Sequence, residues 1–215
     1  MAKKLNTNSN SYIIIYSIVL VVVVAFCLAF VYSSLKEKQD KNVALDVKKQ
    51  VLAALDIREF ADDADAEAQY KNIVVMTDTV DAETSSIIYT CKHNGEDKYI
   101  LSVKGMGLWG PVWGYVALNA DKQTVYGAYF NHESETAGLG AEIKDSKAWQ
   151  DQFKGKKAII DGEVKLGVKK ATDIKPEEKD FTVDGVTGAT LTCNGVDNMF
   201  KESLKKYSDF LNINK

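Results

Sequence analysis

An uncharged apolar run near the N-terminus constrains the fold of this chain more than any other feature. It extends from Tyr12 to Tyr32, 21 residues without Asp, Glu, Lys, Arg or His. A helix of this length spans about 31 Å, which matches the hydrocarbon core of a bilayer. The tyrosines at its two ends suit the membrane–water interface. The run therefore predicts a transmembrane helix.

A cleaved signal peptide is the alternative interpretation of this run, because two lysines precede it. The apolar stretch is too long for a signal peptide, and Val31-Tyr32-Ser33 is a poor cleavage site. Phe26 stands before Cys27 where a lipoprotein signal needs a small residue. We therefore expect an uncleaved anchor. Lysines on both sides, more of them after the span, would by the positive-inside rule place the large domain in the cytoplasm: Lys3, Lys4, Lys36, Lys38 and Lys41.

The rest of the chain has the composition of a globular domain. The whole chain is 27% charged with a net charge of −3, and no basic cluster is interleaved with aromatic residues. Nucleic-acid binding is therefore not indicated. With 215 residues, the chain has room for an anchor and one domain with a core.

Periodicity predicts an α+β domain with a largely antiparallel sheet packed by helices. Helices are expected over 42–57, either capped by Asn42 or as an extension of the membrane helix, over 144–153, and after residue 190, with a helix or a loop over 60–69. Strands are expected over 72–76, 87–91, 99–103, 113–118, 124–130, 158–160 and 164–168. Asn94-Gly95 predicts one tight hairpin and residues 119–122 another, while 172–180 is expected to be a surface loop.

The loop Asp184–Thr192 precedes the C-terminal helix. A stripe of six apolar residues predicts that helix: Val196, Met199, Phe200, Leu204, Tyr207 and Leu211. Thr190 then lies at or just inside the helix N-terminus, where unpaired N–H groups attract anions, phosphate above all. The alternative is that Thr187 or Thr190 only caps the helix.

Two further segments combine glycines with apolar or polar side chains. Residues 105–114 contain four glycines, a proline and two tryptophans, which argues against a regular helix or a central strand. They form either a buried aromatic corner or a wall for a flat ring. In residues 132–140, His132, Glu133 and Glu135 suggest a metal, but no further ligand stands at a suitable spacing.

The segment Asp184-Gly185-Val186-Thr187-Gly188-Ala189-Thr190 resembles the D-G-x-[ST]-G-A-T motif of the FMN-binding domains in redox-driven membrane pumps. In that family the last threonine carries FMN through a phosphoester bond, and it corresponds to Thr190. The resemblance implies that FMN is covalently bound here, with Thr187, Gly188 and Ala189 around it.

The same family shows a G-x-G-L-W-G-P-x-W-G-Y segment at 105–115 and an H-x-x-E-T-P-G-L-G segment at 132–140. The resemblance places Leu108 and Trp109 beside the flavin, with Thr136 and Leu139 approaching its ring and Glu135 and Gly140 in the same segment. This chain has Ala137 in place of the usual proline and Thr187 where serine is common. Neither change removes a hydroxyl or a glycine.

Taken together, these segments make the chain resemble the C subunits of the sodium-translocating NADH:quinone reductase. The alternatives are the related G subunit of the ion-pumping ferredoxin:NAD reductase, a membrane-anchored flavin-binding module without pump function, and a purely structural anchor. The first interpretation divides the chain into a short tail (1–11), the span (12–32), a connecting helical segment (33–70) and the FMN-binding domain (71–215).

The resemblance implies an electron relay in a hetero-oligomeric complex of a bacterial inner membrane. Electrons arrive from an iron–sulfur centre in other subunits and leave to another flavin subunit, towards quinone. The resemblance also implies that the FMN domain lies outside the cytoplasm; this conflicts with the lysine count, and we follow the resemblance because the positive-inside rule weakens for long translocated domains. A flavin transferase that uses FAD and magnesium installs the FMN. No nucleophile–base pair and no nucleotide fingerprint stand in this chain, so NADH is expected to bind another subunit. Cys91 and Cys193 are core residues or a disulfide pair.

Overall fold

The computed structural model describes residues 7 and 9–213. The chain forms two compact units, Met1–Asp46 and Val47–Lys215. The boundary between them falls within the first helix, α1, which runs Asn10–Ala54. The two units are described separately below.

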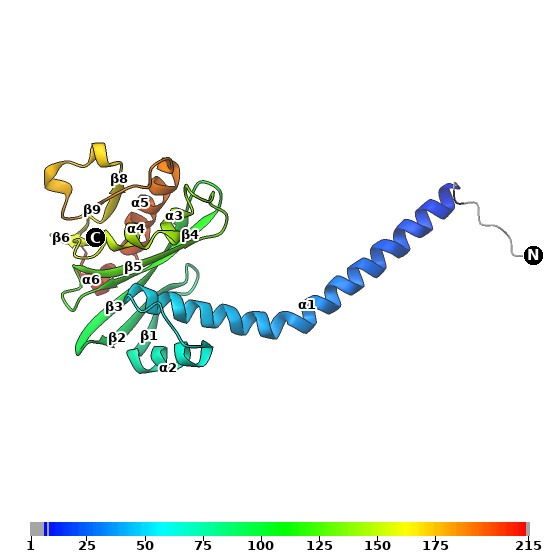
Figure 1. Cartoon of the computed structure of the whole chain (residues 1–215), viewed down its shortest axis with the longest axis horizontal. Helices are drawn as coiled ribbons and strands as arrows, with labels where there is room; N and C mark the ends of the chain where they lie inside the picture. Colours follow the sequence, from blue (N-terminus) through cyan, green and yellow to red (C-terminus); the bar gives the residue numbers. More distant parts are fainter. Residues whose placement is uncertain (1–6, 8, 214–215) are drawn as a thin grey trace, which may run out of the picture. The chain divides into compact units, whose positions relative to one another are not determined.

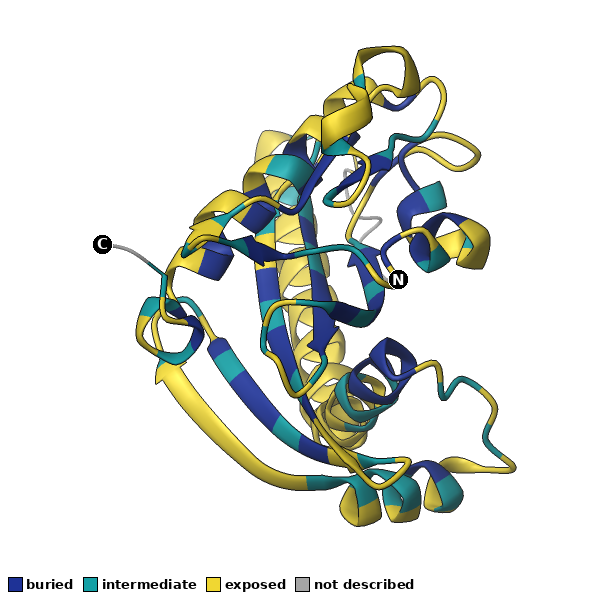
Figure 2. Ribbon diagram, turned by 90° about the vertical axis from the view of Figure 1, so that its left-hand side faces the viewer, coloured by how far each residue is buried: buried dark blue, intermediate teal, exposed yellow. Residues whose placement is uncertain are grey.

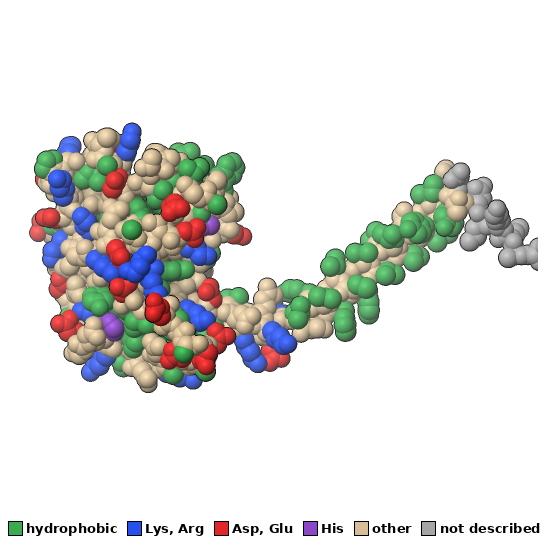
Figure 3. Space-filling view, viewed as in Figure 1, with side chains coloured by type: hydrophobic (Ala, Val, Ile, Leu, Met, Phe, Trp, Pro, Cys, Tyr) green, Lys and Arg blue, Asp and Glu red, His purple; other side chains and the backbone are tan. Residues whose placement is uncertain are grey.

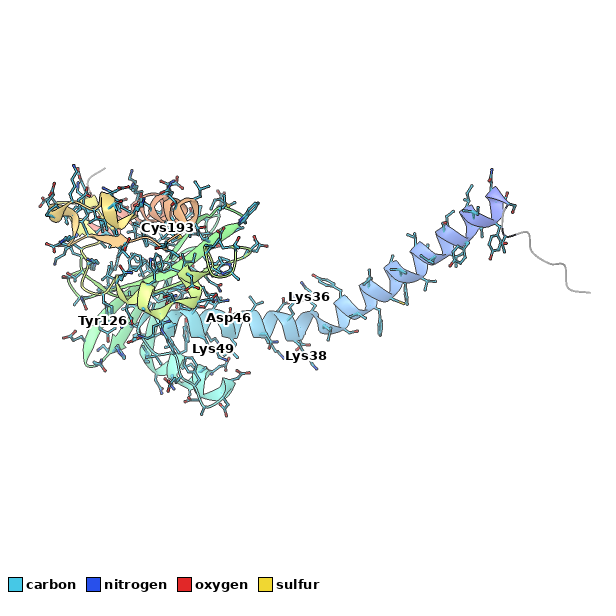
Figure 4. The ribbon with its side chains drawn as sticks, turned by 45° about the horizontal axis from the view of Figure 1, so that its top comes forward. Lys36, Lys38, Asp46, Lys49, Tyr126 and Cys193 are labelled. Atoms are coloured by element: carbon cyan, nitrogen blue, oxygen red, sulfur yellow. The ribbon has the colours of Figure 1, made fainter. Side chains whose placement is uncertain are left out.

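Helix α1 is, among the described residues, the one helix long and apolar enough to cross a membrane. Its side chains from Ile13 to Tyr32 are exposed, and Figure 3 shows them as an apolar sleeve along the helix. Charged side chains begin beyond this stretch, at Lys36 and Lys38 (Figure 4). The predicted Asn42 cap is wrong, because the helix passes through residue 42 without a break. The alternative, that this segment extends the membrane helix, is confirmed as far as Ala54.

The second unit is built on one antiparallel sheet of five strands in the order β1-β2-β3-β4-β5 (Figure 1). Each strand pairs with the next along the chain, so the sheet is a meander, and the predicted α+β class with a largely antiparallel sheet is confirmed. The strands are β1 Val74–Asp81, β2 Ser86–His93, β3 Glu96–Met106, β4 Pro111–Leu118 and β5 Val125–His132.

Both predicted hairpin turns are present. Asn94 and Gly95 have φ of 53° and 79° between β2 and β3, the positive values that a tight hairpin turn needs. Residues 119–124 join β4 to β5, with Asn119 N–H donating to Thr124 O at 2.9 Å.

The expectation that 105–114 avoids a central strand is wrong. β3 continues to Met106 and β4 begins at Pro111, so only residues 107–110 form the connecting turn. Proline is tolerated because it opens its strand. Gly105 is required by packing, since a Cβ there would lie 2.8 Å from Cβ of Met199.

Side chains alternate between the two faces of the sheet, and each face has its own hydrophobic cluster. Figure 2 shows which stretches of the strands and helices are buried. Leu101, Val103 and Val116 pack with Phe130 and with helix α5, Thr190–Lys205. On the opposite face, Ile100, Tyr115 and Ala117 pack with Val51, Ala54 and Leu55 at the C-terminal end of α1. The six residues of the predicted C-terminal stripe are all buried.

Cys91 and Cys193 are both free and buried, and they belong to different clusters on the two faces of the sheet. They therefore serve as small core residues. Burial raises the pKa of the Cys91 thiol to about 12, so it stays protonated at neutral pH.

Several predicted elements have different bounds in the structure. The strand predicted over 164–168 is two separate strands, at 163–164 and 167–169. Helix α2 runs Asp63–Ile73, capped by the Asp62 side chain, so Asn72 and Ile73 are helical and β1 starts two residues later than predicted. The helix predicted over 144–153 is two short helices, α3 Glu142–Asp145 and α4 Lys147–Asp151. Ser146 separates them because its extended backbone lets its hydroxyl cap α4 through Trp149 N–H.

Short elements complete the second unit. β8 and β9 form a parallel pair, in which β9 was not predicted; the loop predicted over 172–180 contains two 3-10 turns; and the C-terminal stripe is divided between α5 and α6. These elements are β6 Ile159–Ile160, β7 Glu163–Val164, β8 Gly167–Lys169, η1 Ala171–Asp173, η2 Pro176–Glu178, β9 Thr182–Asp184 and α6 Ser208–Leu211.

An ion-pair cluster at Asp56 ties the end of α1 to α4. Partial burial raises the pKa of Asp56, but hydrogen bonds from Lys154 at 2.9 Å and Lys147 at 3.0 Å outweigh it and hold that pKa below its usual value. A depressed folded-state pKa stabilises the fold above the unfolded pKa, about 3.9, and this contribution is lost as pH falls through the folded pKa.

We therefore expect Asp56→Asn to lower the free energy of unfolding at pH 7 by less than about 1 kcal/mol, because the cluster is partly exposed. Urea unfolding of both proteins at pH 7 and at pH 3 checks this: the difference between them should shrink at pH 3. A difference that is equal or larger at pH 3 would contradict the assignment.

Candidate functional site

The loop between β9 and α5, residues Gly185–Ala189, is held by short-range backbone contacts; we call it the threonine loop. Gly185 N–H donates to Lys169 O at 2.8 Å, and Ala189 N–H donates to Val186 O at 3.1 Å. Val186 N–H donates to Sγ of Cys193 at 3.2 Å. Figure 4 marks Cys193 on α5. The loop is thus fixed both to the β8–β9 pair and to the helix that follows.

Thr190 is the first residue of α5, as the apolar stripe predicts. The N-cap residue is Ala189, whose side chain cannot cap the helix, and no cap hydrogen bond forms there. Thr187 and Thr190 are exposed, and within residues 7 and 9–213 neither hydroxyl has a hydrogen-bond partner. The capping interpretation of these threonines is therefore wrong. The site offers an accessible hydroxyl beside the uncapped positive end of a 16-residue helix.

A cavity of about 170 Å³ adjoins Thr190. One side is the threonine loop and the first turn of α5, and the other is the segment that follows β8. Lys169 is paired with Glu178 at 2.7 Å, whereas Lys170 has no ion-pair partner in the described part of the chain. The lining residues are Val168, Lys169, Lys170, Ala171, Thr172, Asp184, Gly185, Val186, Thr187, Gly188, Thr190, Cys193 and Asn194.

Leu108, Trp109 and Leu139 are large apolar side chains that remain 46%, 66% and 42% exposed; we call them the apolar wall. Leu139 adjoins the threonine loop, since a Cβ on Gly188 would lie 3.0 Å from Leu139 Cδ2. Gly188 also has a φ of 80°, which favours glycine. The structure thus favours the wall over the buried aromatic corner for Leu108 and Trp109.

The turn 107–110 and the loop 133–140 are joined by hydrogen bonds at the wall. Ser134 Oγ donates to Trp109 O at 3.1 Å, and Trp109 N–H donates to Oε1 of Glu135 at 2.8 Å. Thr192 on α5 donates its hydroxyl hydrogen to Oε2 of Glu135 at 2.5 Å. The three segments that the sequence singled out therefore meet in space.

The predicted site residues divide into an exposed group and a buried group. Thr136, Thr187 and Gly188 are exposed with Thr190 and the wall, and Thr136 O accepts the N–H groups of Leu139 and Ala141, which closes its loop. Glu135, Gly140 and Ala189 are buried. The buried residues therefore contribute to the packing of the site and not to its surface.

Sequence reasoning missed the other side of the cavity, Lys169 to Thr172, and the contact of Thr192 with Glu135. Three-residue strands give no periodic signal, so the parallel β8–β9 pair that brings Lys170 to the loop could not be predicted. That Cys193 lies near Thr190 could have been predicted, because it follows Thr190 by three residues on the same helix face.

A larger cavity, of about 480 Å³, lies beside β3 and β4 near Lys104, Trp113 and Lys206. None of the predicted site residues lines it. The smaller cavity is the candidate site, because it adjoins the free hydroxyl, the uncapped helix end and the threonine loop, and the larger one does not.

Comparison with known proteins agrees with these features. Residues 107–205 match the FMN-binding domain family. The C subunit of the Na(+)-translocating NADH-quinone reductase of Chlamydia muridarum is 39% identical over 129 residues, covering 54% of this chain and 40% of that protein. Its counterpart in Vibrio campbellii is 41% identical over 118 residues, covering 54% and 44%. The match thus spans less than half the length of these curated relatives.

A crystal structure of the corresponding C subunit from Parabacteroides distasonis superposes with a TM-score of 0.75 at 33% identity. It covers 84% of this chain and 98% of that chain. The chain therefore belongs to the family of C subunits of the Na(+)-translocating NADH-quinone reductase, with an FMN-binding domain over residues 107–205.

Proposed function

We propose that this chain is the electron-relay subunit of a sodium-pumping NADH:quinone oxidoreductase and carries FMN covalently on Thr190. The observation that supports this most directly is the unpartnered hydroxyl of Thr190 at an uncapped helix N-terminus, beside an exposed apolar wall. The residues present fit FMN, which has a phosphate at one end and a flat apolar ring at the other.

The phosphate end suits the threonine loop. The cavity of about 170 Å³ is smaller than the roughly 300 Å³ and more of ordinary ligand pockets, so it takes only part of a nucleotide. The N–H groups of the first turn of α5 and the free ammonium group of Lys170 favour an anion there. A phosphodiester on Thr190 would therefore lie close to positive charge.

The attachment is a transfer from FAD by a magnesium-dependent flavin transferase. Thr190 Oγ1 forms a bond to the phosphorus next to the ribityl chain, the pyrophosphate bond breaks, and AMP leaves. The hydroxyl proton passes to a base of the transferase, since no described residue hydrogen-bonds this hydroxyl.

The ring end suits the apolar wall. Leu108, Trp109 and Leu139 expose large apolar surfaces that a flat ring would cover, and aromatic rings stack well on tryptophan. The bound FMN supplies the electron transfer, and the protein holds it and shields part of it from water.

In the complex, electrons come from an iron–sulfur centre in other membrane subunits and pass to a second flavin subunit, towards quinone. Sodium movement takes place in other subunits, because the span 12–32 carries no charged residue that could line an ion path. NADH oxidation takes place in another subunit as well, because this sequence has no nucleotide-binding fingerprint. The span anchors the chain in the bacterial inner membrane, with the FMN domain on the outer side. Covalent attachment prevents the loss of a cofactor that could not be replaced on the outer side of the membrane.

The apolar wall gives a prediction that separates a ligand-binding role from a packing role. We expect Trp109→Ala to leave the free energy of unfolding of the flavin-free chain within about 0.5 kcal/mol, because this side chain is mostly exposed. In the flavin-loaded chain, we expect changed visible circular dichroism and flavin fluorescence. Val75→Ala, a similarly exposed position on β1, should change neither. An unchanged flavin spectrum in Trp109→Ala would contradict the proposed stacking.

The proposed function is tested by producing the full chain with and without a flavin transferase. The denatured protein should fluoresce on a gel when the transferase is present, and stay dark without it. A dark band in both cases contradicts covalent attachment, while flavin that binds only to the folded protein identifies a noncovalent module.

A further inference from the structure

Glu135 occupies an unusual position for a carboxylate in this domain. It is 7% exposed, whereas the three side chains of the apolar wall are between 42% and 66% exposed. Its Oε1 accepts the backbone N–H of Trp109 at 2.8 Å, and its Oε2 accepts the hydroxyl of Thr192 at 2.5 Å. Its own backbone N–H donates to Nδ1 of His132 at 3.1 Å, which fixes the chain where the side chain departs.

These contacts join three segments that are far apart in sequence. Trp109 belongs to the β3–β4 turn, Glu135 to the loop after β5, and Thr192 to the first turn of α5. Thr192 follows Thr190 by two residues. A single carboxylate therefore links both loops of the wall to the helix end that carries the proposed attachment point.

Two glycines leave room for this carboxylate. A Cβ on Gly107 would lie 2.5 Å from Oε1 of Glu135, and a Cβ on Gly140 would lie 2.5 Å from Oε2 and 2.6 Å from the Thr192 hydroxyl. Each distance is shorter than real Cβ contacts allow. Both glycines, which belong to the segments singled out from the sequence, are therefore needed for Glu135 to reach its partners.

Burying a carboxylate is costly unless hydrogen bonds compensate, and a neutral side chain could pack this position without that cost. In a site partly closed to water, the negative charge of Glu135 makes it less favourable for a group bound nearby to gain negative charge.

We propose that Glu135 is the positioning residue of the flavin site. It holds the Leu108–Trp109 turn, the Thr136–Gly140 loop and the start of α5 in one arrangement before flavin arrives, and its charge lowers the reduction potential of the bound flavin. The second part of this inference rests on the proposed function; the first part does not.

The test uses the full chain and four variants. Glu135→Ala removes both hydrogen bonds. Glu135→Gln removes the charge but keeps the size, and its amide can accept from Trp109 and donate to Thr192. Thr192→Val keeps the charge and removes one partner at nearly constant volume. Glu133→Gln is the matched control, the same chemical change two residues away on an exposed side chain.

The first measurement is hydrogen–deuterium exchange of peptides covering residues 107–110 in the flavin-free chain. We expect at least tenfold faster exchange in Glu135→Ala, an intermediate increase in Thr192→Val, and wild-type exchange in Glu135→Gln and Glu133→Gln. Wild-type exchange in both Glu135→Ala and Thr192→Val would overturn the positioning role. If Glu135→Ala fails to fold, the increase in Thr192→Val decides.

The second measurement is a redox titration of the flavin-loaded chain, followed by its visible spectrum. We expect a more positive potential in Glu135→Gln than in the wild type, with Glu133→Gln unchanged. An unchanged potential in Glu135→Gln would overturn the electrostatic role. If the wild type takes up no covalent flavin, the proposed function fails while the exchange measurement still tests the positioning role.

Discussion

Replacing Thr190 by alanine is expected to abolish covalent flavin completely, while the domain stays folded. The alanine has no oxygen to form the phosphoester, and the lost hydroxyl has no hydrogen-bond partner within residues 7 and 9–213. The free energy of unfolding should therefore change by less than about 0.5 kcal/mol. In-gel flavin fluorescence after denaturation, together with urea unfolding of the flavin-free protein, checks both expectations.

Two variants make this result specific to the hydroxyl of Thr190. Thr190→Ser keeps the oxygen and should keep covalent flavin. Thr172→Ala removes a different exposed threonine that lines the same cavity, and it should be labelled like the wild type. A fluorescent Thr190→Ala band would show that flavin is attached through a different residue.

Replacing Phe130 by alanine is expected to produce the largest loss of stability among the substitutions considered. Phe130 is fully buried, and its ring centroid lies 5.0 Å from that of Phe153, 5.5 Å from that of Trp149 and 5.8 Å from that of Phe200. These contacts join β5 to α4, to the segment after it and to α5. Truncation of a buried Phe costs about 3–5 kcal/mol, from lost burial and from the cavity left behind.

Urea unfolding followed by tryptophan fluorescence measures this effect. Phe130→Leu should cost clearly less, since it refills part of the volume. Trp109→Ala supplies the contrast, because it truncates an exposed aromatic residue in the same domain. A Phe130→Ala chain within about 1 kcal/mol of the wild type would show that this cluster does not hold α5 in place.

The sequence predicted those elements whose signals are local and strong. The uncharged run, the Asn94-Gly95 hairpin and the apolar stripe after Thr190 each depend on a few neighbouring residues. Elements decided by capping or by distant partners were placed less well. Ser146 interrupts a helix by capping the next one, and α2 extends through two positions predicted as strand, Asn72 and Ile73.

For residues 105–114, the glycine content was misleading. The glycines do not break the strands there: Gly105 admits Met199 of α5, and Gly114 admits Phe130 of β5, since a Cβ at either position would clash. A glycine needed for close packing and a glycine needed for a turn look alike in a single sequence.

The candidate site, like the fold, was predictable from the sequence only in part. The threonine loop and the apolar wall could be identified from motifs, because the loop is contained in one short segment and the wall in two. The function of Glu135 could not, since its hydrogen-bond partner Thr192 is 57 residues away. The resemblance places Glu135 at the cofactor; the structure shows that its carboxylate is buried and accepts the backbone N–H of Trp109. Lys170 reaches the cavity only through the β8–β9 pair.

Tandem mass spectrometry of the peptide that contains Thr190, from full chain produced with a flavin transferase, tests the central claim most directly. We predict a mass increase equal to FMN less one water, located on Thr190 and absent when the transferase is omitted. An unmodified Thr190 peptide, or the same increase on Thr187 instead, would contradict covalent attachment at Thr190.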